Sequence, residues 1–216
     1  MSGKLIWDLP IRIVHWLLTV LIFGSWYTVT VSGDMERHMI IGQTILCLLI
    51  FRVVWGIIGT RYARFSSFVF GPRAIIAYSR TILSRSAGGY AGHNPLGFLA
   101  VFAMLALIGI QVTTGLFATD GDFYEGPLNH LVAGRTGRQI TNIHYLNFDL
   151  LAIMIAVHVA AIFFYLFYKR ENLIWPMFTG RKTGDELQGI AGSKLGLALG
   201  VFVASAAGVF LLVTLL

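Results

Sequence analysis

The chain has 216 residues; 56% of them are hydrophobic, 12% are charged, and the mean hydropathy is +0.76. This composition leaves too little polar surface to cover a water-soluble globule, so it excludes a soluble domain and predicts an integral membrane protein in contact with lipid. The net charge of +6 does not indicate a nucleic-acid-binding protein, because the basic residues gather in loops between apolar segments.

Polar breaks divide the chain into five apolar runs of about 20 residues, the length that an α-helix needs to cross the bilayer. We therefore predict transmembrane helices over residues 11–31, 38–59, 96–118, 144–168 and 195–216. The first run is too long for a signal peptide and has no small-residue cleavage site, so we expect it to remain in the protein. The predicted fold is an all-α integral membrane protein: a four-helix transmembrane bundle within residues 1–182, then a linker and a fifth, C-terminal transmembrane helix within 183–216.

Local signals predict where the first two helices begin. Asp8 precedes the first helix as an N-cap, and Pro10 suits the first turn because that turn offers no partner for a backbone N–H. A turn at Gly33-Asp34 returns the chain into the second helix, so we expect these two helices to run antiparallel. The single cysteine, Cys47, lies in the middle of a span and is predicted to pack in the core.

The long loop between the second and third spans carries five arginines and no acidic residue between Thr60 and Asn94. The loops on the opposite side hold few basic residues, and these stand beside several acids. The positive-inside rule therefore predicts a cytoplasmic N-terminus and a C-terminus on the outer side. Within the basic loop, the run that starts at Gly71-Pro72 combines apolar and basic residues and is expected to lie along the inner leaflet.

Four histidines lie within or at the edge of the predicted spans: His15, His38, His144 and His158. A histidine in hydrocarbon is costly unless it faces the bundle and has a partner. For any one of them, a hydrogen bond between helices is an alternative explanation. His144 and His158 are 14 residues apart, which corresponds to about 21 Å along a helix and nearly the same helix face. The fourth span therefore offers two imidazoles at two depths.

Alternating helix direction pairs these histidines by depth. His15 and His158 belong to the cytoplasmic half of the membrane, whereas His38 and His144 each open a span at the outer surface. Two imidazoles on one iron leave no open coordination position, which favours electron transfer over oxygen chemistry. A zinc or copper site would need three or four ligands at one depth, which this spacing does not provide. We therefore predict two haem b groups: an inner iron bound by His15 and His158, and an outer iron bound by His38 and His144.

Three arginines are candidate partners of the haem groups. Arg52 is 14 residues after His38 and so lies on the same face, one haem layer deeper; alternatively its side chain snorkels to the cytoplasmic surface. Arg12 and Arg37 lie close to His15 and His38 and suit propionate binding, with interfacial anchoring as the alternative. Glycines within the spans can give room to a flat macrocycle or to close helix packing: Gly24, Gly42, Gly56, Gly109 and Gly115.

Several segments together resemble the bacterial cytochrome b561 family, which includes nickel-iron hydrogenase cytochrome b subunits. The resemblance covers roughly residues 5–182 and rests on WDLPIRIVHW, FRVVWGIIGTRYARFSSFVFGP, GHNPLG, TGLFATD, IHYLNFDLLAIMIAVH and KRENLIWPMFTGRK. It implies a four-helix di-haem core in a bacterial inner membrane, with the four histidines at the ligand positions that their spacing also predicts. The paired histidines of the fourth span are also similar to those of the gamma subunit of respiratory formate dehydrogenase. The last span falls outside the resemblance.

The resemblance also implies a quinone or quinol substrate. In the formate dehydrogenase relatives, an asparagine at the inner start of the third span contributes to a quinone site, and Asn94 falls at that position. We therefore expect a quinone pocket formed by His93, Asn94 and Gly97. The alternative is that Asn94-Pro95 only caps the third transmembrane helix.

These observations favour an electron-transfer protein that links a quinone pool to a redox partner, such as a periplasmic cytochrome c or a dehydrogenase or hydrogenase subunit. The partner is expected to dock at the outer face near the loop Thr119–Asn142, and an oligomer is compatible with this function. A self-sufficient superoxide:quinone oxidoreductase is an alternative that needs no protein partner. A non-redox membrane anchor or transporter is a further alternative, and it predicts a protein without haem.

Overall fold

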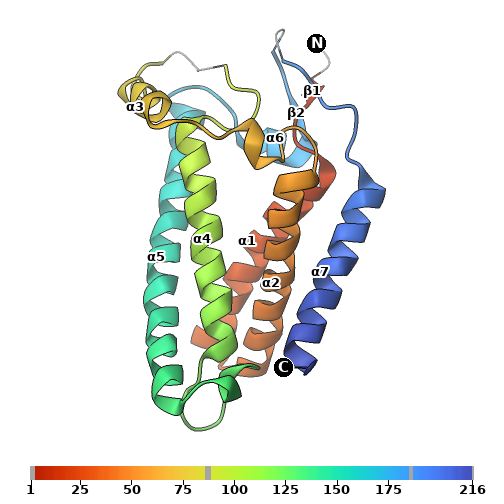
Figure 1. Ribbon diagram of the computed structural model, residues 1–216. Coiled ribbons are helices and arrows are strands. Elements are labelled where there is room, and N and C mark those ends of the chain that lie inside the picture. Colours follow the sequence, from red (N-terminus) through yellow and green to blue (C-terminus); the bar gives the residue numbers. More distant parts are fainter. Residues whose placement is uncertain (1–2, 86–88, 185–186, 216) are drawn as a thin grey trace. The chain divides into compact units, whose positions relative to one another are not determined.

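Five long helices dominate the computed structural model, which describes residues 3–85, 89–184 and 187–215. Each of the five is long and apolar enough to cross a membrane (Figure 1). They are α1 (Leu9–Thr30), α2 (Met35–Ile58), α4 (Pro95–Phe117), α5 (Gly134–Phe167) and α7 (Leu195–Leu215). The predicted all-α membrane fold with an additional C-terminal helix is thereby confirmed.

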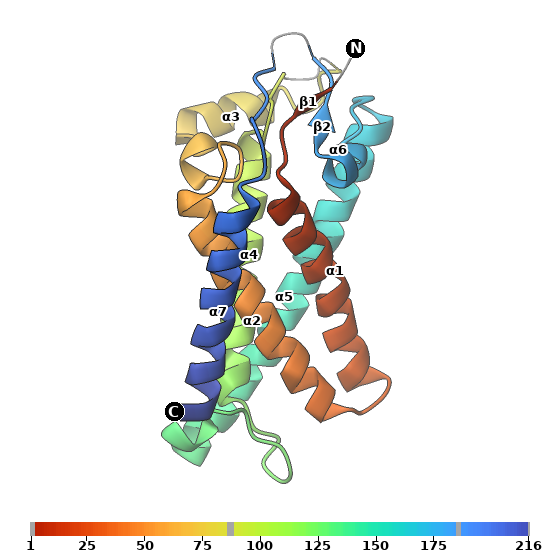
Figure 2. The same cartoon turned by 90° about the vertical axis from the view of Figure 1, so that its right-hand side faces the viewer.

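The shorter elements lie between these helices. The helix α3 (Pro72–Arg80) begins in the run after Gly71 that the sequence singled out, with proline in its first turn. The helix α6 (Ile174–Thr179) precedes a small antiparallel sheet, in which β1 (Lys4–Leu5) pairs with β2 (Arg181–Lys182), as Figure 2 shows. Two short 3-10 helices cover Phe65–Ser67 and Asn129–Leu131.

The helix α5 departs most clearly from its predicted bounds. It begins at Gly134 instead of at His144, so His144 lies inside the helix and not at its start. The prediction was wrong here because apolar composition marks the depth of the hydrocarbon and not the end of a helix. Thr141 stabilises the polar extension: its hydroxyl lies 3.0 Å from the Gly137 carbonyl and accepts the N–H of Thr119 (2.9 Å), which ties the preceding loop to the helix.

The chain forms two compact units, and each long helix contributes residues to both. Unit 1 consists of Met1–Ile13, Val53–Met104 and Met154–Ala198. Unit 2 consists of Val14–Arg52, Leu105–Ile153 and Leu199–Leu216. The division after residue 182 stays a prediction, because it follows the extent of the family resemblance and not the packing of the chain.

Unit 1 is organised around the carboxylate of Asp8, which is completely buried. One carboxylate oxygen accepts the N–H of Ile11 (2.8 Å) and so caps α1, as the sequence predicted. The other oxygen accepts the indole N–H of Trp55 (3.0 Å) and the hydroxyl of Thr60. A single side chain therefore joins the start of α1 to the end of α2 and to the loop that follows it.

A glycine lets two distant segments of unit 1 approach closely. Gly180 has a φ of +78°, and a Cβ at this position would lie 2.6 Å from the carbonyl oxygen of Trp7. The carbonyl of Gly180 accepts the N–H groups of Ile6 (2.8 Å) and Trp7 (3.1 Å). These contacts hold the end of α6 against the segment that leads into α1.

Unit 2 contains the connection between α1 and α2. Gly33 has a φ of +66° and forms the predicted turn, after which Asp34 caps α2 by accepting a backbone N–H (3.0 Å). Cys47 is buried on α2, as predicted. Phe51 of α2 packs against Phe202 of α7 with ring centres 6.5 Å apart, and both views show these helices side by side (Figures 1 and 2).

Replacing Asp8 with alanine is expected to destabilise the protein by about 3 kcal/mol, because an N-cap contributes about 1 kcal/mol and a buried donor left without its acceptor costs about 1–3 kcal/mol. The measurement is thermal unfolding of the purified protein in detergent. Asp34→Ala is the matched control, since it removes a solvent-exposed cap without exposing buried donors. Equal losses of stability in the two variants would contradict the role assigned to Asp8.

Candidate functional site

Unit 2 contains an open cavity of about 340 Å³, and two of the predicted ligand histidines line it. His38 reaches this His38–His144 cavity from α2 and His144 reaches it from α5, while residues of α1, α4 and the loop before α5 complete the wall. The two imidazole ring centres are 6.2 Å apart, and the rings are nearly perpendicular, at 84°. The structure thus brings one predicted pair together in a volume typical of small-molecule sites.

Backbone carbonyls determine which nitrogen of each imidazole carries the proton. The Nδ1 of His38 lies 3.1 Å from the carbonyl oxygen of Ser25, and the Nδ1 of His144 lies 3.0 Å from the carbonyl oxygen of Gln111. A carbonyl can only accept, so each Nδ1 carries the proton and each Nε2 keeps its lone pair. This is the arrangement of a metal-ligating histidine, whose other nitrogen is held by an outer partner.

Gln111 and Asn147 extend the polar network at His144. The Asn147 amide donates to the carbonyl of Leu107 (2.9 Å) and to the side-chain oxygen of Gln111 (2.7 Å). These bonds turn the amide nitrogen of Gln111 toward the Nε2 of His144, 3.0 Å away, where it donates to the lone pair. A metal bound at this nitrogen must therefore replace the Gln111 amide.

The distance between the two rings suits a metal held between them. A metal–imidazole bond is about 2 Å long and each ring centre lies about 1 Å behind its nitrogen, so two imidazoles that would bind one metal would have centres no more than roughly 6 Å apart. The observed separation is 6.2 Å. Within the described parts of the chain, no three His, Cys, Asp or Glu residues gather to hold a bare metal ion. A pair of histidines at this spacing suits an iron whose other ligands come from a porphyrin.

The glycines of the spans separate into two groups. Gly42 and Gly115 line the His38–His144 cavity. A Cβ at Gly115 would lie 3.2 Å from the Cε1 of His144, so a larger residue would displace the imidazole. Gly56 has the alternative role, because a Cβ there would overlap the ring of Phe65 and prevent close packing against α2.

The second predicted pair of histidines is divided between the units. His15 belongs to unit 2 and His158 to unit 1, and both side chains are half-buried on long helices. The His15 ring lies edge-on to Trp16, with centres 5.1 Å apart. Arg52 of α2 is buried. The assignment of His15, His158 and Arg52 to one haem stays a prediction from their spacing.

The two other arginines predicted to bind propionates have protein partners. Arg12 donates to the backbone carbonyls of Asp8 (3.4 Å) and Phe178, which links α1 to α6. Arg37 is mostly exposed and forms an ion pair with Asp34 (3.1 Å). Both sets of contacts correspond to the alternative role of these residues as anchors near helix ends.

Unit 1 contains a smaller cavity of about 210 Å³ beside His93. The walls of this His93 cavity are mainly aromatic and include Tyr62, Phe68, Phe70 and Tyr90. The ring of His93 packs against Phe68, with centres 4.4 Å apart. A flat and largely apolar ligand with few polar groups suits such walls.

Asn94 caps α4, which was the alternative to a role at a quinone. Its side-chain oxygen accepts the N–H of Gly97 (2.7 Å), and Gly97 leaves room for the cap because a Cβ there would lie 3.2 Å from that oxygen. The amide nitrogen of Asn94 donates to the hydroxyl of Tyr165 on α5 (2.9 Å). Of the three predicted quinone residues, His93 lines the cavity, and Asn94 and Gly97 form the adjacent cap.

Comparison with known proteins identifies the family. The model of the prokaryotic cytochrome b561 family matches residues 6–180. The chain belongs to this family. It is also similar to a probable Ni/Fe-hydrogenase B-type cytochrome subunit of Bradyrhizobium diazoefficiens, with 21% identity over 210 residues that cover 82% of this chain and 85% of the relative. No solved structure matches the chain.

Membership in the cytochrome b561 family makes this chain a multi-pass membrane cytochrome of the b type, which binds haem b and takes part in electron transfer. The predicted family, fold and type of cofactor are therefore confirmed. The residues of the His38–His144 cavity fit this cofactor, because they offer two imidazoles whose Nδ1 atoms are held by backbone carbonyls, and glycine in the wall.

Sequence reasoning about this cytochrome b561 missed the residues that hold the predicted ligand histidines in place. Gln111 and Asn147 are polar residues within apolar spans, which was a signal that each needs a partner inside the protein. Ser25 gave no such signal, because its contact with His38 is made through its backbone carbonyl as well as its hydroxyl. Tyr165 was also missed, since a tyrosine near the end of a span is ordinary.

Asp120 orders the loop that borders the His38–His144 cavity. Its carboxylate accepts the backbone N–H groups of Tyr124 (2.9 Å), Asp122 (3.0 Å) and Phe123 (2.9 Å). These three hydrogen bonds hold the pKa of Asp120 below its usual value. The bonds favour the charged form, so the folding of the loop and the ionisation of Asp120 are coupled.

This coupling predicts a loop that loosens in acid. Because the pKa of Asp120 is lower in the folded loop, its contribution to stability is complete above the ordinary carboxyl pKa and is lost as the pH falls through the lowered value. We expect the protection of residues 121–125 from amide hydrogen exchange to decrease as the pH falls below the ordinary carboxyl pKa of about 4, and to be low at every pH in Asp120→Ala. Asp122→Ala, in the same loop, is the control. Protection that does not depend on pH in the parent would contradict this prediction.

Proposed function

We propose that this cytochrome b561 is a di-haem protein that carries electrons across the membrane between a quinone pool and a redox partner. The observation that carries the proposal is the pair of imidazoles of His38 and His144, whose centres are 6.2 Å apart and whose Nδ1 protons are held by backbone carbonyls. Two such ligands leave an iron no open position for oxygen. Haem b supplies one-electron redox chemistry when bound, and the protein sets its ligands and electrostatics.

A second haem b is proposed between His15 and His158. The 14-residue interval between His144 and His158 supports it, because this interval corresponds to about 21 Å along one face of α5. Arg52 follows His38 at the same interval on α2 and is buried. We assign to Arg52 a positive charge that favours the negatively charged propionates of this haem.

The quinone head group is proposed to bind at the His93 cavity. Aromatic walls suit a flat ring, and His93 offers ring nitrogens to a quinone oxygen. Asn94 and Gly97 hold the start of α4 beside this cavity through their capping hydrogen bond. The cavity belongs to unit 1, as does His158, one of the two ligands proposed for the second haem.

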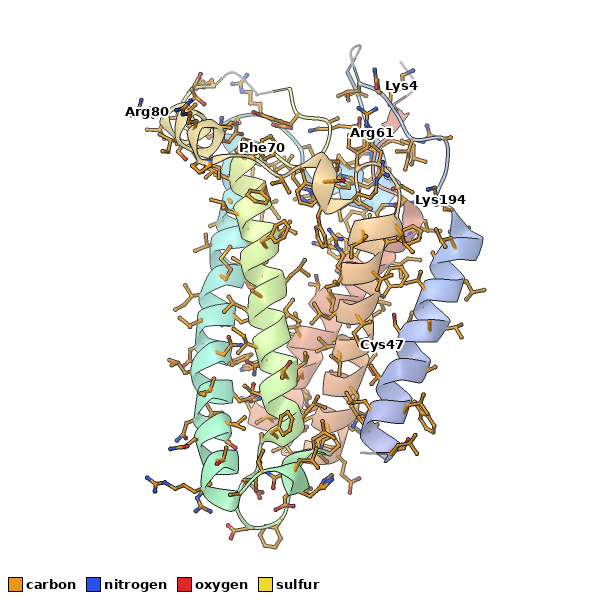
Figure 3. All side chains as sticks on the ribbon, viewed as in Figure 1. Lys4, Cys47, Arg61, Phe70, Arg80 and Lys194 are labelled. Carbon is orange, nitrogen blue, oxygen red and sulfur yellow. The ribbon has the colours of Figure 1, made fainter. Side chains whose placement is uncertain are left out.

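The distribution of charge supports an orientation in which unit 1 faces the cytoplasm of a bacterial inner membrane. All lysines and arginines other than Arg37, Arg52, Arg135 and Arg138 belong to unit 1. Figure 3 shows the labelled basic side chains of this unit near one of its ends. By the positive-inside rule this end is cytoplasmic, which places the N-terminus inside and the C-terminus in the periplasm.

A periplasmic cytochrome c or a dehydrogenase or hydrogenase subunit is proposed as the redox partner. The similar chain from Bradyrhizobium diazoefficiens is named as a hydrogenase cytochrome subunit. The loop around Asp120 borders the His38–His144 cavity and exposes Phe123, of which 88% is accessible, beside Asp122 and Glu125. A partner with a basic rim around an apolar patch complements this surface.

Single alanine substitutions of the four histidines test the haem assignment. We expect two haems per chain in the parent, with His38→Ala and His144→Ala affecting one haem and His15→Ala and His158→Ala affecting the other. The measurement is the haem-to-protein ratio together with reduced-minus-oxidised spectra. His130→Ala, a change at an exposed histidine, is the control and should keep both haems. A haem that is lost in both His15→Ala and His38→Ala would contradict the pairing.

Two substitutions of Asn94 test the quinone site. We expect Asn94→Ala to slow quinone turnover about tenfold, the effect of one lost hydrogen bond of about 1.4 kcal/mol, while both haems remain bound. Asn94→Asp is the matched variant, because it keeps the oxygen that caps α4 and loses the amide donor. Turnover at the parental rate in Asn94→Ala would remove Asn94 from the site.

A further inference from the structure

Two buried tyrosines of unit 1 share a hydrogen bond between their hydroxyls. Tyr78 of α3 and Tyr165 of α5 are both more than nine-tenths buried, and their hydroxyl oxygens are 2.6 Å apart. The amide of Asn94 donates to the Tyr165 hydroxyl (2.9 Å). Three separate segments of the chain, α3, the start of α4 and the end of α5, therefore meet at the oxygen of Tyr165.

A buried cation lies over both tyrosine rings. Lys169 is 5% exposed, and its Nζ is 5.8 Å from the ring centre of Tyr78 and 5.4 Å from that of Tyr165. Glu171 and Lys182 form a partly buried ion pair in the same unit, at 2.8 Å. Burying an ammonium group and two hydroxyls is costly. Apolar contacts would anchor α3 at a lower cost in free energy. We therefore infer that the cluster has a function besides anchoring α3.

The cluster adjoins the His93 cavity. Asn94, which bonds Tyr165, directly follows His93 in the chain. Tyr90 lines the cavity and also packs edge-on against Tyr78, with ring centres 5.6 Å apart. Tyr90 is therefore at once a wall of the cavity and a direct neighbour of the Tyr78–Tyr165 pair.

Building on the proposed quinone site, we propose that the Tyr78–Tyr165 pair relays protons between the cytoplasmic surface and a quinone bound at the His93 cavity. Reduction of a quinone takes up two electrons and two protons, and oxidation of the quinol releases both. The electrons pass between the quinone and the haem groups of the cytochrome, as in the proposed function. In quinone reduction the protons pass one at a time: Tyr165 gives its hydroxyl proton to the quinone oxygen as Tyr78 donates its own to the Tyr165 oxygen, and water reprotonates Tyr78. In quinol oxidation the same steps run in reverse, and each proton leaves to water from Tyr78.

The hydrogen bonds of Tyr165 with Asn94 and with Tyr78 determine how the proton transfer can proceed. The Tyr165 oxygen accepts from Asn94, and this bond holds the oxygen in place during the exchange. Burial, followed by the hydrogen bond to Tyr165, raises the pKa of Tyr78 above its usual range. The Tyr78 hydroxyl therefore does not persist as an anion. It must gain a new proton as it gives up the old one. The Lys169 ammonium stabilises negative charge that develops on either ring oxygen during the transfer.

The test compares three tyrosine-to-phenylalanine variants of the purified, haem-loaded protein. Tyr165→Phe and Tyr78→Phe remove the relay. Tyr168→Phe is the matched control, because Tyr168 directly follows α5 and its hydroxyl donates to the Leu83 carbonyl (2.8 Å), which anchors the loop that follows α3. The readouts are the rate of haem reduction by duroquinol in H₂O and in D₂O, and the rate of reduction by dithionite, which needs no proton transfer at the quinone site.

We expect Tyr165→Phe and Tyr78→Phe to slow reduction by duroquinol by about tenfold or more, as for loss of a proton-transfer group, with a larger solvent deuterium effect than in the parent. Reduction by dithionite and the haem content should remain unchanged, and Tyr168→Phe should behave as the parent. Where Tyr165→Phe does not retain haem, Tyr78→Phe, whose change lies outside the long helices, decides the question.

Two outcomes would overturn the relay and leave the quinone site intact: parental rates in both relay variants, or equal slowing in Tyr168→Phe. A parent protein that duroquinol does not reduce, although dithionite does, would instead overturn the quinone function itself, and the relay with it. The failure of the relay and the failure of the proposed function are therefore distinguishable in one series of measurements.

Discussion

A polar group within hydrocarbon must have a partner, and the site of this cytochrome depends on how that requirement is met. An unpaired group costs roughly several kcal/mol in such surroundings. The imidazoles of His38 and His144 meet the requirement by donating from Nδ1 to the carbonyls of Ser25 and Gln111. The same bonds leave the lone pair on Nε2. The Nδ1–carbonyl hydrogen bond therefore has two effects. It lowers the free-energy cost of burying each histidine in the membrane, and it leaves Nε2 free to act as the proposed ligand.

Gln111 meets the same requirement at the nitrogen proposed to bind iron. Its amide donates to the Nε2 of His144, while Asn147 holds the amide oxygen in place. The ligand nitrogen thus has a partner before a metal arrives, and metal binding exchanges one partner for another. This exchange subtracts about 1 kcal/mol, the value of one hydrogen bond, from the free energy of binding. In return, the helices that form the cavity contain no unsatisfied nitrogen at this position.

The parts of the structure that the sequence predicted are those with local or periodic signals. Apolar runs predicted the long helices, and Asp8 and Gly33 predicted a cap and a turn from single residues. The start of α5 was wrong because a helix can continue beyond the hydrocarbon in polar residues. The partners of Gln111 and Asn147 could not be predicted, since they depend on which faces of α4 and α5 meet, and a single sequence does not encode that directly. The proposed second haem and its ligation still depend on spacing alone.

Asn94 shows why a structural role does not exclude a functional one. Its side chain has two polar ends, and they make different contacts: the oxygen caps α4 at Gly97, and the amide nitrogen donates to Tyr165. Serine, threonine or aspartate would serve as well for the cap, because capping needs only an acceptor. The second contact needs a donor on the same side chain, and asparagine carries its donor and its acceptor on separate atoms, whereas serine and threonine carry both on one oxygen. The contact with Tyr165 is therefore what favours asparagine here, beside the cavity that is proposed to bind a quinone.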